Sequence, residues 1–313
     1  MRILVVGAGG IGGYFGGRLL EGGCDVTFLV RPRRAAQLSA AGLDLRSPKG
    51  DYHHPQPPTV QVATLRGPFD LVLLSCKAYD LDDAIRSFAP AVGPDTTILP
   101  LLNGMRHLDV LEQRFGSAAV LGGQCVISVA LDEQGTIRHL NDSHLLSFGE
   151  KDTSRSARVR AIEATLSRAR FELRLSEQII QEMWEKWVFL ATLAGITCLM
   201  RATVGDVVAA GGAELTARLL AECATIAADS GFRPSLSSQE RSLRILTAPG
   251  SAITASMLRD IERAGATEVE HVLGDLIRRR VAPSHVPSIL CIAYLHVAAY
   301  EIRRQRTAQV LGS

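Results

Sequence analysis

The chain has 313 residues, more than one compact domain usually holds, so its length favours about two domains. Hydrophobic residues make up 47% of the chain and charged residues 21%, which is typical of a globular protein with a large core and excludes a disordered one. The net charge of only +2, with basic residues spread along the chain, predicts neither nucleic acid nor a membrane surface as a partner.

The first segment, residues 1–6, is an apolar run that ends at glycines and predicts a buried strand. Apolar residues after it recur at helical spacing, so the glycines lie on a strand-to-helix turn of the pattern GxGxxG. Gly7 suits a tight turn, Gly9 the close approach of a pyrophosphate, and Gly12 the packing of helix on strand. The sequence therefore predicts a dinucleotide-binding turn made of Gly7, Ala8, Gly9, Gly10, Ile11 and Gly12.

The second predicted strand, residues 25–31, ends at the position whose side chain distinguishes NAD from NADP in dinucleotide-binding sheets. An NAD site normally has an acidic residue there, whereas this chain has Arg31, followed by Arg33 and Arg34. Guanidinium groups suit a 2′-phosphate by charge and by bidentate geometry, which favours NADP. A solvated basic turn is the alternative interpretation.

The rest of the first half alternates loops and apolar runs. The Pro-, Gly- and His-rich segment 43–62 predicts a loop-bearing insertion or hairpin. Residues 70–76 and 96–102 predict buried parallel strands, so Lys77 and Asn103, which follow them, are expected at the ligand edge of the sheet. Further strands at 120–129, 136–140 and 145–148 are predicted to complete this sheet. A helix at 154–169 is predicted to close the domain.

No metal site or disulfide framework is predicted. His53 and His54 have no acidic or cysteine partner at ligand spacing. The six cysteines are scattered without CxxC spacing and are interpreted as reduced, partly buried thiols. The N-terminus begins directly with a strand, so secretion is not expected and a cytoplasmic location is predicted.

From about Ser176 onward, strand signals give way to helical spacing. The uncharged run at 187–200 is 14 residues long, shorter than a membrane span needs, and predicts a buried helix. The predicted helices are 176–201, 213–230, 235–247, 251–264, 266–281 and 285–305, with breaks at Gly231, Pro234, Pro249-Gly250, Pro283 and Pro287. The fold class is thus α/β, a Rossmann-type doubly wound sheet in residues 1–173 followed by an all-helical domain in residues 174–313.

Two residues of the helical half are candidates for catalysis. A reductase needs an acid to protonate the oxygen that gains charge as hydride reaches the carbon. Lys186 stands immediately before the apolar run, and Glu268 is a carboxylate that would keep such an ammonium available as a proton donor. The alternative is a snorkelling lysine at a helix entrance and a solvated glutamate.

Five motifs in order make the chain similar, over nearly its full length, to the ketopantoate reductase (2-dehydropantoate 2-reductase) family. They are Gly7-Ala8-Gly9-Gly10-Ile11-Gly12, Cys76-Lys77-Ala78-Tyr79-Asp80, Leu102-Asn103-Gly104-Met105, Trp184-Glu185-Lys186, and Ser256-Met257-Leu258-Arg259-Asp260 with Thr267-Glu268. This resemblance implies an NADPH-dependent enzyme with a Rossmann domain and a helical domain.

The resemblance also implies roles for single residues. Lys186 matches the general acid, and Glu268 the carboxylate that contacts substrate or cofactor and places the lysine. Asn103 matches a residue shared by cofactor and substrate, and Ser256 matches a substrate-binding hydroxyl. Two further matches contact the NADPH, namely Arg31 at its 2′-phosphate and Lys77.

Three substrate-side asparagines of the family pattern are replaced here by Leu190, Ala194 and Val204. An apolar wall cannot pair the same hydroxyl and carboxylate atoms. We therefore predict the same chemistry, hydride transfer to the ketone of a small 2-oxo acid, on a different and less polar substrate. One alternative is genuine 2-dehydropantoate 2-reductase activity, with water or other side chains such as Thr197 or Arg201 in place of the asparagines. The other is a non-catalytic NADPH-binding regulatory protein. A homodimer through the helical domain is a further expectation.

Overall fold

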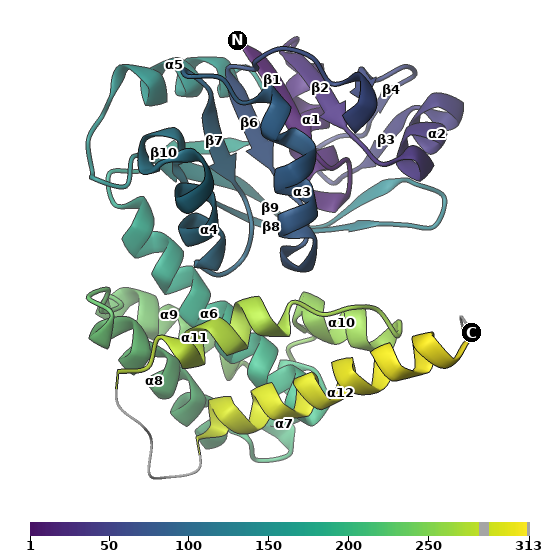
Figure 1. Ribbon diagram of the computed structural model, residues 1–313. Coiled ribbons are helices and arrows are strands. Elements are labelled where there is room, and N and C mark those ends of the chain that lie inside the picture. The colour runs from purple at the N-terminus through teal and green to yellow at the C-terminus, as the bar shows by residue number, and fades with distance from the viewer. Residues whose placement is uncertain (282–287, 312–313) are drawn as a thin grey trace. The chain divides into compact units, whose positions relative to one another are not determined.

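The computed structural model describes residues 1–281 and 288–311, the last two of these by their backbone only. The described chain forms two compact units (Figure 1). The first consists of Met1–Leu102 and His107–Ile180, and the second of Asn103–Arg106 and the chain from Gln181 onward.

A parallel sheet of five strands forms the centre of the first unit (Figure 1). Its strands are β1 (Arg2–Val6), β2 (Asp25–Leu29), β5 (Thr59–Val60), β6 (Leu71–Leu74) and β7 (Thr97–Pro100), in the order β5-β2-β1-β6-β7. Every residue of β6 and β7 is buried, as in a sheet covered on both faces. This order is the doubly wound arrangement, and it confirms the predicted fold of the N-terminal half. Ligands of such sheets bind beyond the carboxyl ends of the strands, where the order reverses between β1 and β6.

A second sheet corrects one prediction. The segments at 120–129, 136–140 and 145–148 do not complete the parallel sheet. They form β8 and β9, which pair with each other along nearly their whole length. The chain just before β8 lies beside β7 of the parallel sheet, through the bridge of Val120 with Ile98 and the bond from Leu121 N to Ile98 O. The second sheet holds β3 (Leu43–Arg46), β4 (Tyr52–His54), β8 (Gly122–Leu131), β9 (Ile137–Gly149) and β10 (Glu172–Leu175). Its β3–β4 pair is the hairpin expected within 43–62.

Helix α1 (Gly10–Glu21) is packed tightly against strands of both sheets. A Cβ atom built on Gly16 would lie 2.5 Å from the ring of Phe28 in the parallel sheet. One built on Gly13 would lie 2.3 Å from Ile137 in the second sheet. Because both faces of α1 are in contact, its N-terminus is held rigidly at the end of β1.

The remaining helices of the first unit follow strands. They are α2 (Pro32–Ala41), α3 (Leu81–Phe88), α4 (Arg106–Phe115) and α5 (Ala157–Leu166), with short 3-10 turns at Val62–Thr64, Ala78–Asp80, Ala89–Ala91 and Ser117–Ala119. Of these, only α5 was predicted, within 154–169. The structure starts it at the cap Ser156, whose hydroxyl accepts from the N–H of Val159.

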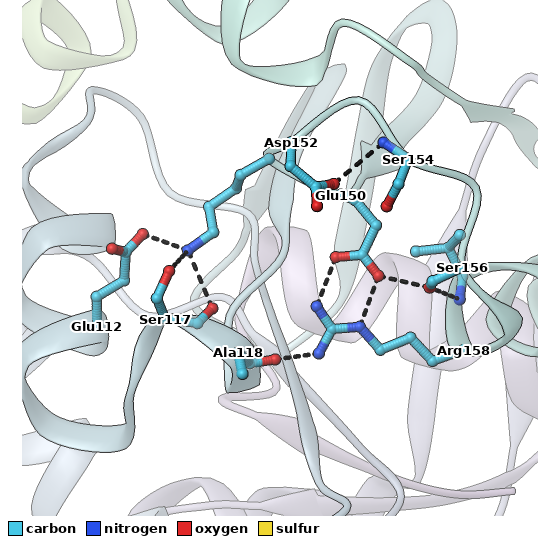
Figure 2. A network of polar contacts seen from close by, with 10 residues as sticks. Glu112, Ser117, Ala118, Glu150, Asp152, Ser154, Ser156 and Arg158 are labelled. Atoms are coloured by element: carbon cyan, nitrogen blue, oxygen red, sulfur yellow. Dashed lines mark hydrogen bonds and ion pairs between the residues drawn. The ribbon is translucent and has the colours of Figure 1, made fainter.

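A polar network fixes the start of α5 to the end of β9 (Figure 2). Glu150 is almost fully buried, and its carboxylate accepts from Arg158 Nε at 2.7 Å and from Ser156 Oγ at 2.6 Å. Arg158 also donates to the carbonyl of Ala118 (Figure 2). These bonds hold the pKa of Glu150 below its usual range, chiefly through Arg158, so the carboxylate stays ionised.

The described part of the second unit is helical, as predicted (Figure 1). Its elements are α6 (Ile179–Met200), α7 (Val204–Ala209), α8 (Ala213–Asp229), α9 (Leu236–Leu246), α10 (Ser256–Glu262), a π-helical turn (Glu270–Gly274), α11 (Asp275–Arg278) and α12 (Ile289–Leu311). The helix predicted at 251–264 starts only at Ser256, because the carbonyls of Ser251 and Ile253 accept from the N-terminus of α7. The predicted breaks at Pro283 and Pro287 lie outside the described residues.

Helix α6 contains the 14-residue uncharged run and is a core helix, as predicted. Trp187, Ala191 and Ile196 are at most 1% exposed. Among the described residues, α6 is the one helix long and apolar enough to cross a membrane, and 67% of its most apolar window is buried inside the structure. A buried core helix meets the same criteria, so α6 is weak evidence for a membrane span.

Candidate active site

The glycine turn after β1 has the backbone that the sequence pattern requires. Gly7 has φ 93°, a left-handed conformation that favours glycine, and its N–H donates to Leu29 O at 3.0 Å. A Cβ on Gly12 would lie 2.1 Å from the carbonyl oxygen of Gly7 and 2.1 Å from Ser75 Oγ. The tight turn and the close packing of α1 are therefore confirmed, whereas binding of a pyrophosphate stays a prediction.

The start of α1 fits an anion. Gly9 is the N-cap, no side chain of the described residues caps it, and the first turn has no acidic residue. A Cβ built on Gly9 would meet no atom within 4 Å, so the turn opens onto free space there. Uncapped N–H groups at a helix N-terminus bind phosphate well. Gly10, Ile11 and Gly12 supply these groups, with Gly7 and Ala8 in the turn before them.

Two residues brace this turn, and sequence reasoning missed their role. The Ser75 hydroxyl donates to Val6 O at 3.0 Å and lies 3.3 Å from Gly7 O. Arg34 Nε donates to Ala8 O at 2.9 Å, and its Nη1 donates to Gly135 O at 3.1 Å. Ser75 directly follows β6, so the strand-end rule that pointed to Lys77 could also have pointed to Ser75.

Arg31 is the N-cap residue of α2, two residues beyond the end of β2. Its side chain is 63% exposed, and its Nη2 contacts Asp80 Oδ1 at 2.8 Å and Asp83 Oδ2 at 2.9 Å. The bond to Asp80, with the bond to Asp83 next, raises the pKa of Arg31. A 2′-phosphate at Arg31 would thus compete with the exposed carboxylate of Asp83 and the partly buried one of Asp80. Lys77 is half-buried and starts the short turn that carries Asp80.

In the second unit, the structure brings Lys186 and Asn103 together. Lys186 lies on α6 and is half-buried, and its Nζ donates to Asn103 Oδ1 at 3.3 Å, across 83 residues of sequence. The next residue on α6, Trp187, donates from Nε1 to Val272 O at 2.9 Å. These two bonds fix α6 to the 103–106 segment and to the π-helical turn.

Glu268 is 8% exposed and lies two residues before the start of that turn. Its carbonyl accepts from His271 N at 3.0 Å and from Val272 N at 2.9 Å. A Cβ on Gly104 would lie 2.8 Å from His271 O, so the segment after Glu268 packs against the residue after Asn103. Lys186, Asn103 and Glu268 therefore lie on three segments that are bonded or packed together.

Ser256 is exposed and is the first residue of α10. The residue before it, Ala255, donates from N to Thr197 Oγ1 at 3.4 Å. Thr197 lies about three helical turns beyond Lys186 on α6. The substrate-binding role of Ser256 stays a prediction.

The three positions that replace the family's asparagines are buried or half-buried. Leu190 is half-buried, and Ala194 is 4% exposed on the same helix. Val204 is 1% exposed, and its N–H donates to Ile253 O at 3.0 Å, which seals the start of α7. The candidate substitutes differ in setting, since Thr197 Oγ1 donates to Leu193 O at 2.6 Å while Arg201 is exposed.

Within the described ranges, no group of three or more His, Cys, Asp or Glu residues is arranged to hold a metal ion. All six cysteines are free thiols, and burial raises the pKa of Cys198 and of Cys223 to about 12. Neither thiol is a nucleophile at neutral pH.

Comparison with known proteins decides the family. Residues 3–153 match the family model described as ketopantoate reductase PanE/ApbA, and residues 178–284 match its C-terminal domain. The chain is 39% identical over 97% of its length to the whole of "Uncharacterized oxidoreductase YkpB" of Bacillus subtilis. This protein belongs to the ketopantoate reductase family.

Two further relatives of this member of the ketopantoate reductase family are named for 2-dehydropantoate 2-reductase activity. It is 27% identical to a 2-dehydropantoate 2-reductase of Mesorhizobium japonicum, over 86% of this chain and 88% of that one. The crystal structure of 2-dehydropantoate 2-reductase from Geobacter metallireducens matches with a TM-score of 0.85 and 25% identity, over 96% of this chain and 100% of that one. The family model and these named relatives are ketopantoate (2-dehydropantoate) reductases, so the chain belongs to a family of oxidoreductases.

Proposed function

We propose that the protein is an NADPH-dependent reductase that delivers hydride to the ketone of a small 2-oxo acid, with Lys186 as the proton donor. The observation that carries this proposal is the 3.3 Å contact between Lys186 Nζ and Asn103 Oδ1, packed beside the segment that begins at the buried Glu268. An ammonium held by a neutral amide is suited to donate a proton, and a neighbouring carboxylate such as Glu268 would keep it charged.

Residues 1–173 would bind the dinucleotide, and residues 174–313 would bind substrate and form a homodimer. When bound, NADPH supplies the hydride. The α1 N-terminus (Gly10, Ile11, Gly12) and the turn before it (Gly7, Ala8, Gly9) would hold its pyrophosphate, because their N–H groups are uncapped by side chains.

The chain's own residues would then handle one proton and the charge on oxygen. Lys186 Nζ would donate its proton to the oxygen that gains charge, and Asn103 Oδ1 would keep the ammonium aimed. Glu268 would orient the ammonium and the product hydroxyl. Ser256 would donate a hydrogen bond to the substrate, and Asn103 would also contact the nicotinamide.

The preference for NADP would come from Arg31 and Lys77. Arg31 is exposed just beyond β2, where an NAD enzyme would need a carboxylate. The 2′-phosphate would replace Asp80 and Asp83 as the partner of the guanidinium. Because these carboxylates compete for Arg31, the preference for NADP over NAD would be smaller than an arginine without such partners would give.

The substrate would be less polar than 2-dehydropantoate. Leu190, Ala194 and Val204 offer no hydrogen bond, and the Thr197 hydroxyl already donates within α6. Genuine 2-dehydropantoate 2-reductase activity, in which Arg201 would serve, is the alternative to test. A cytoplasmic location belongs to the same proposal.

The test is a screen of NADPH oxidation over 2-oxo acids of graded size and polarity, 2-dehydropantoate included. We expect the highest kcat/KM with a branched, unhydroxylated 2-oxo acid. Highest activity on 2-dehydropantoate would favour the alternative substrate. Tight NADPH binding with no oxidation of any carbonyl compound would contradict the enzyme assignment and favour a regulatory protein.

A further inference from the structure

Two buried polar atoms flank Glu268 without a hydrogen-bond partner among the described residues. They are Thr267 Oγ1 and His271 Nε2, and their residues are 6% and 8% exposed. Buried polar side-chain atoms in native proteins are nearly always paired with protein, ordered water or a ligand. Two unpaired atoms on residues that precede and follow Glu268 in the sequence therefore indicate a place where something else binds.

The backbone around His271 is unusual. Residues Glu270–Gly274 form a π-helical turn, a rare conformation that occurs frequently at functional sites. Its first residues are fixed by the bonds from His271 N and Val272 N to Glu268 O. His271 is thus the second residue of a wide turn whose start is bonded to the backbone of Glu268.

The π-helical turn is also bonded to the segments that carry the candidate catalytic residues. Val272 O accepts from Trp187 Nε1 at 2.9 Å, one residue from Lys186. His271 O packs against Gly104, where an added Cβ would be only 2.8 Å away, one residue from Asn103. His271 is thus held by backbone contacts to the neighbours of both Lys186 and Asn103.

We propose that His271 is a substrate-binding residue whose Nε2 donates a hydrogen bond to the carboxylate of the 2-oxo acid, with the Thr267 hydroxyl as a second donor. This proposal rests on the proposed function. Every 2-oxo acid has a carboxylate that needs donors once it is buried, and the apolar Leu190, Ala194 and Val204 cannot supply them.

The charge state of His271 makes the proposal measurable. Burial lowers the pKa of His271. The charged groups that act on it are Glu268, Asp275, Arg106 and Arg278, two of each sign. An added carboxylate would favour the imidazolium, so the pKa would rise on binding and a proton would be taken up from solution. Binding should then tighten as the pH falls from 8 toward 6.

The experiment titrates 3-methyl-2-oxobutanoate into protein saturated with NADP⁺, a mixture that cannot react, by calorimetry in buffers of different ionisation enthalpy. We expect proton uptake by the wild type and none by His271→Gln, whose amide still donates a hydrogen bond. The matched control is His296→Gln, at an exposed histidine of α12, which should behave as the wild type.

Kinetics provide the second readout. We expect His271→Phe to raise KM for the 2-oxo acid about 30-fold, with kcat and the KM for NADPH nearly unchanged, and His271→Gln to restore most of the loss. Thr267→Val should raise the same KM less. Thermal melting shows whether each variant is folded. If His271→Phe is unfolded, the calorimetry of His271→Gln tests the proposal instead.

Unchanged proton uptake in His271→Gln, or an unchanged KM in a folded His271→Phe, would overturn the proposal and would indicate a buried water at Nε2. If proton uptake on binding depends on His271 but the protein oxidises no NADPH with any 2-oxo acid, only the proposed function is contradicted. No binding of any 2-oxo acid would overturn both.

Discussion

The candidate binding surface of the first unit is one continuous turn of backbone, whereas that of the second unit is a set of side chains from three distant segments. Gly7 to Gly12 act through their N–H groups and their lack of side chains. Lys186, Asn103 and Glu268 would act through an ammonium, an amide and a carboxylate. Their segments are joined by the Lys186–Asn103 bond and by the bond from Trp187 to Val272 in the π-helical turn.

This difference separates what single substitutions should do. A change in the turn of the first unit should weaken dinucleotide binding and leave proton transfer intact. A change in the side-chain set of the second unit should slow turnover and leave dinucleotide binding intact.

The largest effect is expected from Lys186→Ala. Loss of the general acid should lower kcat by about 10³-fold, while the Kd for NADPH stays within a few-fold of the wild type. Steady-state kinetics and fluorescence titration measure the two quantities. Lys49→Ala, at an exposed lysine of the first unit, is the control and should change neither. A variant that keeps kcat within a few-fold of the wild type would show that Lys186 is not the acid.

The glycine turn offers a matched pair. Gly12→Ala places a Cβ 2.1 Å from Gly7 O and should both lower the melting temperature and weaken NADPH binding by about 100-fold. Gly9→Ala meets no protein atom, so it should leave the melting temperature unchanged and still weaken NADPH binding. If Gly9→Ala binds NADPH as well as the wild type does, the pyrophosphate does not approach this turn.

Arg31→Ala should lower the preference for NADPH over NADH by about 30-fold, because it removes a charged partner of the 2′-phosphate. Asp83→Asn should raise the preference slightly, because it removes a competing carboxylate. Kd values for both dinucleotides measure this. An equal loss of NADPH and NADH affinity in Arg31→Ala would place the arginine elsewhere on the cofactor.

Leu190→Asn tests the substrate side of the second unit. Leu190 is half-buried one turn beyond Lys186, so an asparagine fits there without filling a closed core. One regained hydrogen bond should raise kcat/KM for 2-dehydropantoate about tenfold relative to 3-methyl-2-oxobutanoate. The apolar control is Leu190→Met. If the ratio of the two kcat/KM values is the same in the wild type and in both variants, this position does not line the substrate pocket.

Arg158→Met should not affect activity at neutral pH but should destabilise the first unit. It leaves the buried Glu150 carboxylate without its main partner, at a cost of about 2 kcal/mol. Since Arg158 lowers the pKa of Glu150, this stability is present above the ordinary value of 4.5 and is lost as the pH falls through the folded-state value. Denaturant unfolding at pH 7 and pH 3 should show the difference from the wild type shrinking at low pH. A constant difference would indicate lost packing instead.

Sequence patterns were most informative where the structure is local. The strand–turn–helix around Gly7 and Gly12 and the helix at Ala213–Asp229 were predicted nearly to their ends, because their signals lie within a few residues. Helices α2, α3 and α4 were missed, since each follows a strand after a short polar turn with no long apolar period. The prediction that segments 120–129 and 136–148 complete the parallel sheet was wrong, because a strand pattern does not encode which strands will pair.

The side-chain set of the second unit was less accessible to sequence reasoning. Lys186 and Glu268 had ordinary interpretations by themselves, and only the order of the family's motifs distinguished them. The Lys186–Asn103 contact joins residues 83 positions apart, and the π-helical turn that carries His271 has no spacing rule to reveal it.

The most direct test of the central claim is chemical rescue of Lys186→Ala by methylammonium, followed as single-turnover NADPH oxidation with the best 2-oxo acid of the screen. A cation that fits the vacated position should restore the rate in proportion to its concentration, and an equal concentration of tetramethylammonium, which has no proton to donate, should not. Full turnover by Lys186→Ala without any amine would contradict the claim.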